Sequence, residues 1–407
     1  MTTFIGIDWS EQKHDVIFMN GHGDAVLYLV VPHSADGFME FEQKRHALGL
    51  RPDDCVVGLE TAHNLLIDHL WSYEYREVFV IPPNVVKSTR GRYGQTGART
   101  DKSDALLLAD LLRTDRARLH PWKPDQLLTR QMRATVNRIH YHTRQIVSLS
   151  NRLRAVLLRY YPAALTVFSS HRQRIALAFL QAYPTPQAAS QLTYAEFEAF
   201  AKQHHYRRPK LLPACYKRLQ ASHPQTRTDT AQVYYQEAKQ LAELLETLLD
   251  VKSQALKDWN ALFCQHPDHD IFASLPGCGE FLAPALLTKF GDDRQRFPAP
   301  QHIQALAGTC PVTEMSGKRR IIRFRRACDK DFRHFTQQWA RTSLGQSAWA
   351  TSYWDRIRSN CASTQHAYRC LANRWLAVAW KLWQDRLCYD EAFHLQQSLK
   401  HRRPRQQ

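Results

Sequence analysis

Alternation of apolar and polar positions at the start of the chain predicts three short strands. Their apolar stretches are Phe4–Asp8, Asp15–Met19 and Ala25–Val30, and the separators at 10–13 and 20–23 are rich in turn-forming residues. Strands joined by such short connections pair as antiparallel hairpins. The pattern therefore predicts an antiparallel meander whose first strand ends in an acidic residue.

After the meander, helical and strand patterns alternate. The sequence predicts a helix over about 34–48, a strand over 55–60, a helix over 61–73 and a strand over 77–81 that Pro82 ends. Three antiparallel strands followed by helix, strand, helix, strand and helix is the order of a ribonuclease H-like α/β domain. In that topology the first and fourth strands lie side by side, so the carboxyl ends of both strands meet at one crevice.

From about residue 126 the apolar period becomes that of long helices. Ile139, Ile146, Leu153 and Tyr160 recur every seven residues, and a second helix with steps of four and three runs from 234 to 262. These two helices fit an antiparallel pair within one chain or a dimer interface. The sequence between them, 161–224, has no pattern that assigns it a role.

The last third of the chain is predicted to be mostly α-helical, with its tryptophans packed in a core rather than stacked on bases. Within Leu275-Pro276-Gly277-Cys278-Gly279 the pattern resembles a helix-hairpin-helix turn, in which Gly277 and Gly279 let backbone amides approach a phosphate. The predicted domains are an α/β catalytic domain over 1–122, a helical coiled-coil linker and oligomerisation region over 123–268, and a mostly α domain over 269–407.

Charge favours a nucleic-acid partner. Lys and Arg outnumber Asp and Glu by 55 to 38 in 407 residues, which gives a formal net charge of +17. An excess of this size favours a polyanionic partner, and no apolar stretch is long enough to span a bilayer. The N-terminus lacks a signal-peptide pattern. The 9 cysteines are scattered without a Cys-x-x-Cys pair, which indicates reduced, mostly packed thiols rather than zinc ligands or disulfides. We therefore expect a cytoplasmic protein that binds nucleic acid and no membrane.

Four acidic residues fall where the predicted fold brings side chains together. Asp8 and Glu60 end adjacent strands, and Asp101 and Asp104 lie in the first turn of a helix that Thr100 or Asp101 caps. Each of these acids alone is commonly a solvated side chain, favoured at a helix start by the helix dipole. Four carboxylates in one pocket suit two Mg²⁺ ions, which in phosphodiester cleavage activate the nucleophile and stabilise the leaving oxygen. The set predicts metal-dependent nuclease or transesterification chemistry.

Two basic segments are candidates for the contact with nucleic acid. One is the glycine-rich stretch 87–99 with the helix start that follows it, which also fits a solvated loop, and the other is the arginine-rich stretch 318–341. Ser316 precedes the second stretch and a glycine, so its hydroxyl could lie uncrowded beside a bound phosphate, although Ser-Gly is also an ordinary hairpin turn. The candidate nucleic-acid contacts in the two stretches are Arg90, Arg92, Arg99, Lys102, Lys318, Arg319, Arg320, Arg323, Arg325 and Arg326.

Taken together, these motifs resemble a known family. They are Gly-Ile-Asp8-Trp-Ser, Gly-Leu-Glu60-Thr-Ala, Thr-Asp101-Lys-Ser-Asp104-Ala, Leu-Pro-Gly-Cys-Gly and Ser316-Gly-Lys-Arg-Arg. In this order they resemble the DEDD transposases of bacterial insertion sequences, the family numbered one-ten. The resemblance implies a RuvC-like domain whose four acids, matched by Asp8, Glu60, Asp101 and Asp104, bind magnesium.

The resemblance further implies a transposase domain whose serine, matched by Ser316, attacks the DNA phosphodiester. Ser274, Ser343 and Ser347 are alternative matches for that serine. It also implies cut-and-rejoin recombination through a covalent serine–DNA intermediate, with active sites shared between protomers as dimers assemble to a tetramer. A noncoding bridge RNA would guide the reaction by pairing with donor and target DNA.

Three other functions fit the same residues. A metal-dependent nuclease of the Holliday-junction type would use water as the nucleophile, and Ser316 would then be only a turn residue. A site-specific DNA invertase would use the same site on inverted sequences. A nonenzymatic nucleic-acid-binding scaffold is the third, and an intact set of four acids argues against it, because carboxylates beside DNA phosphates weaken binding.

Overall fold

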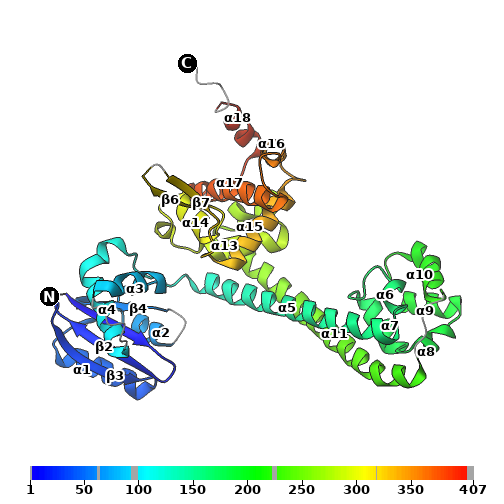
Figure 1. Cartoon of the computed structure of the whole chain (residues 1–407), viewed down its shortest axis with the longest axis horizontal. Helices are drawn as coiled ribbons and strands as arrows, with labels where there is room; N and C mark the ends of the chain where they lie inside the picture. Colours follow the sequence, from blue (N-terminus) through cyan, green and yellow to red (C-terminus); the bar gives the residue numbers. More distant parts are fainter. Residues whose placement is uncertain (1, 62–64, 93–99, 222–226, 318, 401–407) are drawn as a thin grey trace. The chain divides into compact units, whose positions relative to one another are not determined.

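The computed structural model describes residues 2–61, 65–92, 100–221, 227–317 and 319–400. The chain divides into two compact units, Met1–Pro124 and Asp125–Gln407 (Figure 1). The first boundary lies close to the predicted end of the α/β domain at 122. No helix in the described ranges is long and apolar enough to cross a membrane.

Unit 1 is built on a five-stranded sheet with strand order β3-β2-β1-β4-β5. The first three strands pair antiparallel, and β1, β4 and β5 pair parallel, so the predicted meander and the predicted adjacency of the first and fourth strands are confirmed. The strands are β1 (Thr3–Trp9), β2 (Lys13–Met19), β3 (Ala25–Pro32), β4 (Cys55–Leu59) and β5 (Glu77–Val80).

Helices cover both faces of this sheet. One face packs against α1 (Ala35–Ala47) and α2 (Leu65–Ser72), and the other packs against α3 (Pro83–Thr89) and α4 (Asp101–Asp115). Of the helix predicted over 61–73, residues 62–64 lie outside the described residues. The layers and their order are those of the predicted ribonuclease H-like α/β domain.

A pair of glycines lets α4 lie directly on the sheet. Gly6 of β1 and Gly58 of β4 are neighbours in register, and both face α4. A Cβ atom on Gly6 would lie 1.9 Å from the carbonyl oxygen of Ala105, and one on Gly58 would lie 2.8 Å from Leu112 Cδ1. Because the Ala105 clash is with backbone, no rotamer change relieves it, and the position of α4 depends on Gly6.

We predict that Gly6→Ala pushes α4 away from β1 and lowers the free energy of unfolding. Inserting atoms into a packed core typically costs about 1–3 kcal/mol, and a backbone clash places this change at or above that range. Gly21→Ala is the matched control, because a Cβ atom there has no neighbour within 4 Å. Urea unfolding followed by circular dichroism measures both variants; equal stabilities would show that Gly6 does not set the position of the helix.

Two long helices form the middle of unit 2. These are α5 (Leu127–Tyr160) and α11 (Thr228–Cys264), which run side by side in opposite directions (Figure 1). The four positions that recur every seven residues in α5 are all buried, as the pattern predicts; they are Ile139, Ile146, Leu153 and Tyr160. The pair within one chain is thus observed, and a further role in dimerisation stays a prediction.

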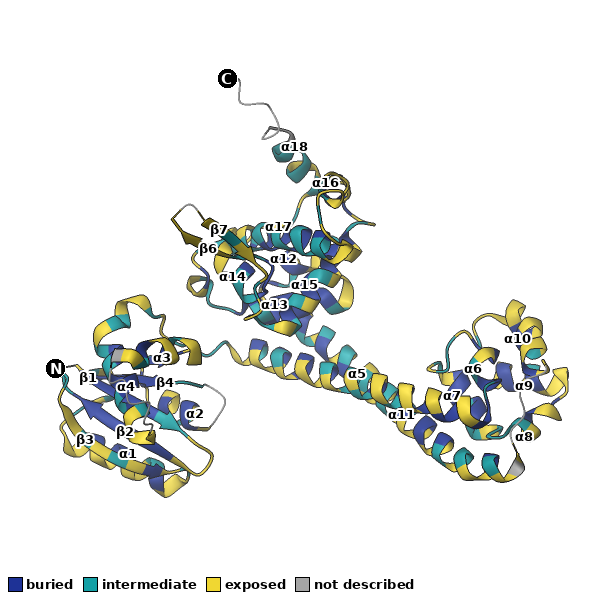
Figure 2. Ribbon diagram, viewed as in Figure 1, coloured by how far each residue is buried: buried dark blue, intermediate teal, exposed yellow. Residues whose placement is uncertain are grey.

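Within the stretch without an assigned role, 161–224, the described residues up to 221 form short helices packed around one end of the helix pair. Their core includes Leu157 of α5 and Leu245 of α11 together with Phe179 and Phe197. Figure 2 shows that the inward faces of these helices are buried while their outer faces are exposed. The helices are α6 (Ala164–Val167), α7 (Arg174–Ala182), α8 (Pro186–Ser190), α9 (Tyr194–Gln203) and α10 (Leu212–Leu219).

The other end of the helix pair belongs to the core of the C-terminal helices. Met132 and Ile139 of α5 and Trp259 of α11 pack in one cluster with residues from α13 to α17. The region predicted over 123–268 is therefore not a separate packing unit at this end. The C-terminal elements are α12 (His269–Ala273), α13 (Gly279–Phe290), α14 (Pro300–Leu306), β6 (Val312–Ser316), β7 (Arg319–Arg323), α15 (Lys330–Ser343), α16 (Ala348–Arg358), α17 (Thr364–Asp385) and α18 (Glu391–Lys400).

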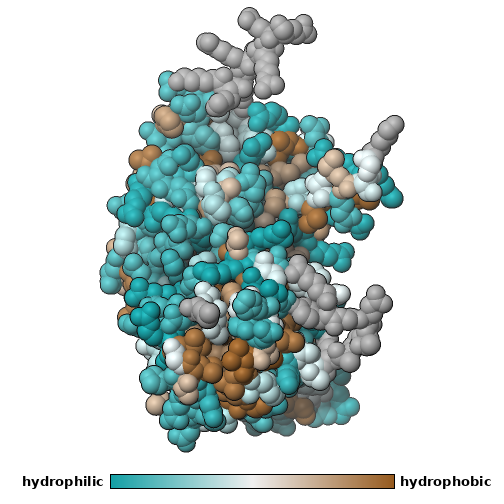
Figure 3. Space-filling view, turned by 90° about the vertical axis from the view of Figure 1, so that its left-hand side faces the viewer, coloured by the Kyte–Doolittle hydropathy of each residue, from teal (hydrophilic) through white to brown (hydrophobic). Residues whose placement is uncertain are grey.

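Short 3₁₀ turns connect several of these elements. They are η1 (Pro52–Asp54), η2 (Arg90–Arg92), η3 (Arg116–Arg118), η4 (Pro209–Leu211) and η5 (Arg294–Arg296). The face shown in Figure 3 is largely hydrophilic and carries apolar patches, the largest of them in the lower part of the view. Exposed apolar side chains of unit 1 include Val26, Tyr28 and Val30 on the edge strand β3.

Candidate active site

Strand alternation directs two carboxylates toward the face of the sheet that α4 covers. Phe4 of β1 packs in the cluster on this face, and Gly6 lies against α4, so the next residue of the same parity, Asp8, points the same way. Glu60 directly follows β4, whose Val56 and Gly58 face α4 as well. Since Ile7 pairs with Leu59, Asp8 and Glu60 follow neighbouring positions of two parallel strands.

The start of α4 brings the other two acids to this edge. Of the two predicted N-cap residues, Thr100 is the one observed. Its hydroxyl accepts a hydrogen bond from Ser103 N at 3.1 Å, and Ser103 Oγ accepts one from Thr100 N at 3.1 Å. This capping box fixes where the helix begins. Asp101 and Asp104 consequently occupy its first turn, where the helix dipole favours negative charge.

The pKa of Asp8 responds to the other carboxylates of the site. Burial raises the pKa of Asp8 most, and the negative charges of Asp104, Asp101, Glu60 and Asp15 raise it further, from its ordinary value of 3.8 to about 7. The four predicted acids therefore lie close enough to interact electrostatically. Burial and these negative charges therefore disfavour the ionised form of Asp8.

Two cations partly compensate this charge. Arg90 Nη2 lies 3.0 Å from Asp104 Oδ2 and 4.0 Å from Glu60 Oε1. Lys13 Nζ lies 3.6 Å from Asp101 Oδ2 and 3.5 Å from Asp15 Oδ2. The structure places the Arg90 guanidinium group beside two of the acids, and the predicted contact of Arg90 with nucleic acid stays a prediction. Its Nε atom is buried and has no hydrogen-bond partner among the described residues.

The four acids, all within the described residues, offer the oxygen ligands that suit a hard divalent cation, but no three of them bring carboxylate oxygens within 4.8 Å of one another in this structure. Carboxylate oxygens are the ligands that Mg²⁺ prefers, and the raised pKa of Asp8 shows that the set gains from added positive charge. Asp8, Glu60, Asp101 and Asp104 would hold such an ion, with the Arg90 guanidinium group giving up its contacts to Glu60 and Asp104.

The structure adds a fifth carboxylate, Asp15, which the sequence analysis did not include in the site. It lies opposite Asp8 in the β1–β2 register, its side chain is buried, and it accepts a hydrogen bond from the hydroxyl of Tyr28. Lys102, predicted to contact nucleic acid, lies with its ammonium group 4.7 Å from the centre of the Tyr28 ring. The short turn at 10–13 fixes which residues of the hairpin face each other, so the pairing of Asp15 with Asp8 could have been predicted from the sequence.

Ser316 lies in unit 2, at the end of the β6–β7 hairpin. It pairs with Arg319 across the two strands, and Gly317 in the turn has φ +54°. Ser316 is exposed, and the described part of the chain gives its hydroxyl no hydrogen bond. The Ser-Gly segment is thus a hairpin turn, and this turn also presents the hydroxyl to solvent.

The alternative serines are engaged within the fold. Ser343 is fully buried, donates to Ala340 O at 2.9 Å and accepts from Trp375 Nε1 at 2.9 Å. Ser347 is buried, caps α16 and donates to Glu391 Oε1 at 3.1 Å. Ser274 Oγ donates to Ile271 O at 2.7 Å. Of these serines, Ser316 has the hydroxyl that a DNA phosphate could reach.

The hairpin that carries Ser316 and the segment after it are rich in arginine, and Arg319 pairs directly with Ser316. Arg319, Arg320 and Arg326 are exposed, Arg323 is exposed and lies 3.1 Å from Glu314, and Arg325 donates to Cys310 O at 3.3 Å. Three residues predicted to contact nucleic acid cannot be placed: Arg99 and Lys318 lie outside the described residues, as does the side chain of Arg92.

The turn between α12 and α13 differs from the predicted phosphate-binding hairpin. Gly277 N already donates to Gln346 Oε1 at 2.8 Å, and a Cβ atom on Gly277 would lie 2.5 Å from Ser343 N. Gly277 therefore serves a close contact with the end of α15, and its amide is not available to a phosphate. Gly279 is exposed with φ +54°, and its role as a phosphate contact stays a prediction.

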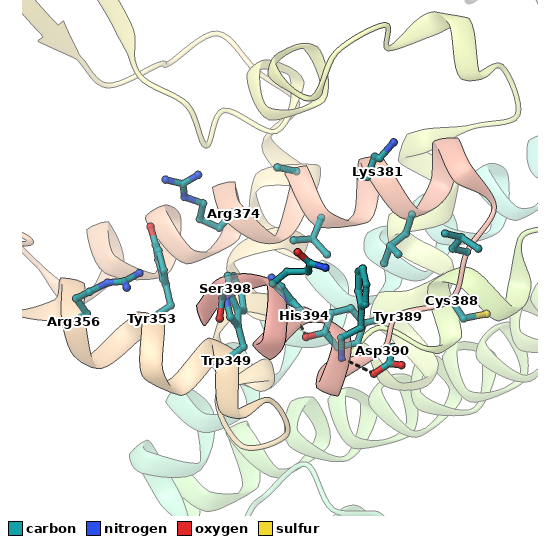
Figure 4. Close-up of a pocket in the computed structure, with 16 residues that line it drawn as sticks. Trp349, Tyr353, Arg356, Arg374, Lys381, Cys388, Tyr389, Asp390, His394 and Ser398 are labelled. Carbon is teal, nitrogen blue, oxygen red and sulfur yellow. Dashed lines mark hydrogen bonds between the residues drawn. The ribbon is translucent and has the colours of Figure 1, made fainter. Parts of the chain in front are cut away.

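A pocket of about 700 Å³ lies between α16, α17 and α18 (Figure 4). Aromatic residues such as Tyr353 and Tyr389 line it together with the cations Arg356, Arg374 and Lys381. Aromatic faces and cations are the groups with which proteins hold unpaired bases and their phosphates.

The prediction of core packing is confirmed for most of the tryptophans; those buried are Trp339, Trp349, Trp354, Trp375 and Trp383.

Comparison with known proteins gives two matches along the chain. Residues 5–162 match the DEDD transposase family of the IS110 type, and residues 269–355 match the family described as transposase IS116/IS110/IS902. The first match includes all four acids, and divalent-metal dependence is the chemistry expected of a DEDD domain. The second includes the β6–β7 hairpin and Ser316. The first match thus covers the candidate acids of unit 1, and the second covers the candidate serine of unit 2.

Relatives extend this likeness over nearly the whole chain. The sequence is 30% identical over 410 residues to the mini-circle putative transposase for IS117 of Streptomyces coelicolor, covering 96% of each chain. It is 26% identical over 328 residues to an uncharacterized 42 kDa protein of insertion element IS900 of Mycobacterium paratuberculosis, covering 78% of this chain and 79% of the relative. A putative transposase y4uE of Sinorhizobium fredii is 26% identical over 207 residues, covering 50% of this chain and 57% of the relative.

Proposed function

The chain belongs to the IS116/IS110/IS902 family of transposases, enzymes that act on DNA, and we propose that it cuts and rejoins donor and target DNA through a covalent serine–DNA intermediate. In this proposal the reaction depends on Mg²⁺, two ions per composite site, and a noncoding bridge RNA selects the DNA. The observation that carries the proposal is the position of the other three acids around Asp8: burial most, and then the charges of Asp104, Asp101 and Glu60, raise the pKa of Asp8 to about 7.

The acids of unit 1 supply the metal-binding half of the site. Asp8, Glu60, Asp101 and Asp104 are proposed to hold the ions, and Asp15 holds Lys13 near Asp101. When bound, Mg²⁺ neutralises charge on the scissile phosphate and makes a hydroxyl a stronger nucleophile. Arg90 keeps Asp104 and Glu60 compensated in the absence of metal, so that the acids stay together at neutral pH.

Ser316 is proposed to supply the nucleophile. Its Oγ atom attacks the scissile phosphorus and loses its proton, the new Oγ–P bond forms, and the bond from phosphorus to one DNA oxygen breaks. That oxygen leaves as a hydroxyl after it takes up a proton. In the rejoining step a DNA hydroxyl attacks the serine phosphodiester, which restores the Ser316 hydroxyl and the DNA backbone. Phosphodiester bonds are exchanged one for one, so no energy source is required.

The hairpin is proposed to hold the DNA backbone. A two-stranded sheet is marginally stable alone in water, yet Met315 and Ile322 on this hairpin are 73% and 61% exposed. A bound nucleic acid or protomer would cover them. The exposed Arg319 and Arg320 lie on the strand that pairs with that of Ser316, so phosphates held there would lie near its hydroxyl.

We predict that Arg320→Ala weakens DNA binding and reduces its salt dependence. Each lost phosphate contact lowers the slope of log K against log salt concentration by about 0.9. Fluorescence anisotropy of labelled duplex DNA over a range of salt concentrations measures this slope. The exposed Lys202 of α9 gives the control, Lys202→Ala; if both variants match the wild type, the hairpin does not bind the DNA backbone.

The guide RNA and the oligomer are proposed from the family resemblance, with support from the chain's charge and exposed surfaces. A net charge of +17 exceeds what the hairpin alone accounts for, and the pocket between α16, α17 and α18 has the groups to hold an unpaired base. A homodimer that assembles to a tetramer would let unit 1 of one protomer serve unit 2 of another. The division of unit 2 at 268/269 into a linker region and a transposase domain is part of this proposal.

The test is a reconstituted reaction. Full-length protein is incubated with donor DNA, target DNA, RNA transcribed from the flank of the element, and Mg²⁺, and the recombinant junction is sequenced. The proposal expects junctions only when RNA and Mg²⁺ are both present. Junctions without RNA would remove the guide from the proposal, and cut DNA that never rejoins would favour the alternative of a metal-dependent nuclease that uses water.

A further inference from the structure

We propose that Cys361, His366 and Cys370 form a second metal site, of the type that binds Zn²⁺. One ligand atom from each of the three residues lies within 4.8 Å of the other two. Cys361 lies in the connection after α16, and His366 and Cys370 lie one helical turn apart near the start of α17. All three side chains are partly exposed, so an ion could enter from solvent.

The local fold explains why these side chains converge. Residues four apart on a helix share one face, so His366 and Cys370 point the same way from α17. Ser363 caps this helix by accepting a hydrogen bond from His366 N at 3.1 Å, which turns the preceding connection back over the first turn of the helix. Cys361, two residues before the cap, then faces the same surface as Cys370.

The donor set selects the metal. Two thiolates and one imidazole nitrogen are soft to borderline ligands, which suit Zn²⁺ and not Mg²⁺, whose ligands are oxygen atoms. Three protein ligands would leave one position of a tetrahedral Zn²⁺ site open to solvent.

The position of the site suggests what it stabilises. Tyr368 stacks on Trp354 with ring centroids 4.4 Å apart, and Arg369 lies 4.7 Å from the centre of the Phe324 ring. Phe324 directly follows β7, so the helical turn that carries Cys370 also holds the base of the β6–β7 hairpin. An ion bound here would fasten the α16–α17 corner and, through Arg369, the hairpin that carries Ser316.

The experiment measures metal binding by the full-length protein, kept reduced throughout so that a Cys361–Cys370 disulfide cannot form. Chelator-treated protein is titrated with Co²⁺ and, separately, with Zn²⁺, and bound metal is counted by mass spectrometry of the native chain. We expect one ion per chain, a thiolate-to-cobalt absorption band, and displacement of Co²⁺ by Zn²⁺ but not by Mg²⁺.

Variants separate this site from the acidic one. Cys361→Ser and Cys370→Ser should each abolish the thiolate-to-cobalt band, while Cys388→Ser, which changes an exposed cysteine, and Asp8→Asn should leave it unchanged. The cobalt band of the wild-type protein is itself a test of the proposal, so a folding defect in one variant does not decide the result. Absence of the band in the wild type, or its persistence in a Cys361→Ser/Cys370→Ser double variant, would overturn the proposal.

Discussion

Replacing Asp8 with asparagine abolishes DNA cutting and, in metal-free protein, raises the thermal stability at pH 8. Cutting should fall by more than about 100-fold, because even residues that only orient metal ligands typically change activity by about 10–100-fold. The stability gain arises because the substitution removes a charge that burial and the four neighbouring carboxylates oppose. One substitution is thus expected to move activity and stability in opposite directions.

The sign of the pH dependence follows from the direction of the shift. The Asp8 pKa is about 7 in the folded state and close to the ordinary 3.8 in the unfolded state, so between these values the folded state binds more protons. Stability therefore falls as pH rises from about 4 to about 7. Asp8→Asn lacks this titration, so its advantage over the wild type should be absent below about pH 4 and fully present above about pH 7.

Differential scanning fluorimetry at pH 4 and pH 8, with and without Mg²⁺, checks this prediction. Mg²⁺ should raise the melting temperature of the wild type more at pH 8 than at pH 4 and should have little effect on Asp8→Asn. Asp36→Asn, on the exposed first turn of α1, is the matched control in unit 1. An Asp8→Asn protein that is no more stable than the wild type at pH 8 would show that the acids do not converge on Asp8.

Replacing Ser316 with alanine should eliminate the covalent protein–DNA adduct while leaving the fold unchanged. Ser316 is exposed at a hairpin turn, so removing its hydroxyl creates no cavity and breaks no hydrogen bond among the described residues. Loss of an enzyme nucleophile typically lowers the rate by about 10⁴-fold or more. Adducts are detected as labelled DNA that migrates slowly on a denaturing gel until protease is added.

Two further variants sharpen this result. Thr313→Ala changes an exposed residue of the same strand with the opposite parity, so its side chain points to the other face of the hairpin and it should form adducts as the wild type does. Ser343→Ala removes the partner of Trp375 and should lower stability without removing adducts from the folded fraction. An adduct that survives in Ser316→Ala would assign the nucleophile to another residue.

The fold of unit 1 could be predicted because its pattern is local. Short turns fixed the hairpins, and the order of strands and helices predicted that Asp8 and Glu60 would end adjacent strands. Asp15 was not predicted as part of the site because it lies near the start of a predicted strand, where an acidic residue is commonly a solvated side chain. Arg90 lies in a basic stretch of sequence, which predicts a contact with DNA, and only the tertiary fold shows it beside Asp104 and Glu60.

Unit 2 depended more on contacts between distant residues. The helical period predicted α5 and α11 but could not show that Trp259 and Met132 pack with the C-terminal helices. Gly277 looked like a phosphate contact, and the structure shows that its missing Cβ instead admits the backbone at Ser343. The convergence of Cys361, His366 and Cys370 has no Cys-x-x-Cys signal, because a loop and a helix face create it.

The central claim is that Ser316 carries the DNA during the reaction, and mass spectrometry of the trapped adduct tests it most directly. Wild-type protein is stopped during the reaction with donor DNA, RNA and Mg²⁺, digested with protease and nuclease, and the nucleotide-bearing peptide is sequenced. The account predicts a phosphodiester on Ser316 that is absent without Mg²⁺ and absent in Asp8→Asn. A nucleotide on any other residue, or cut DNA without an adduct, would contradict it.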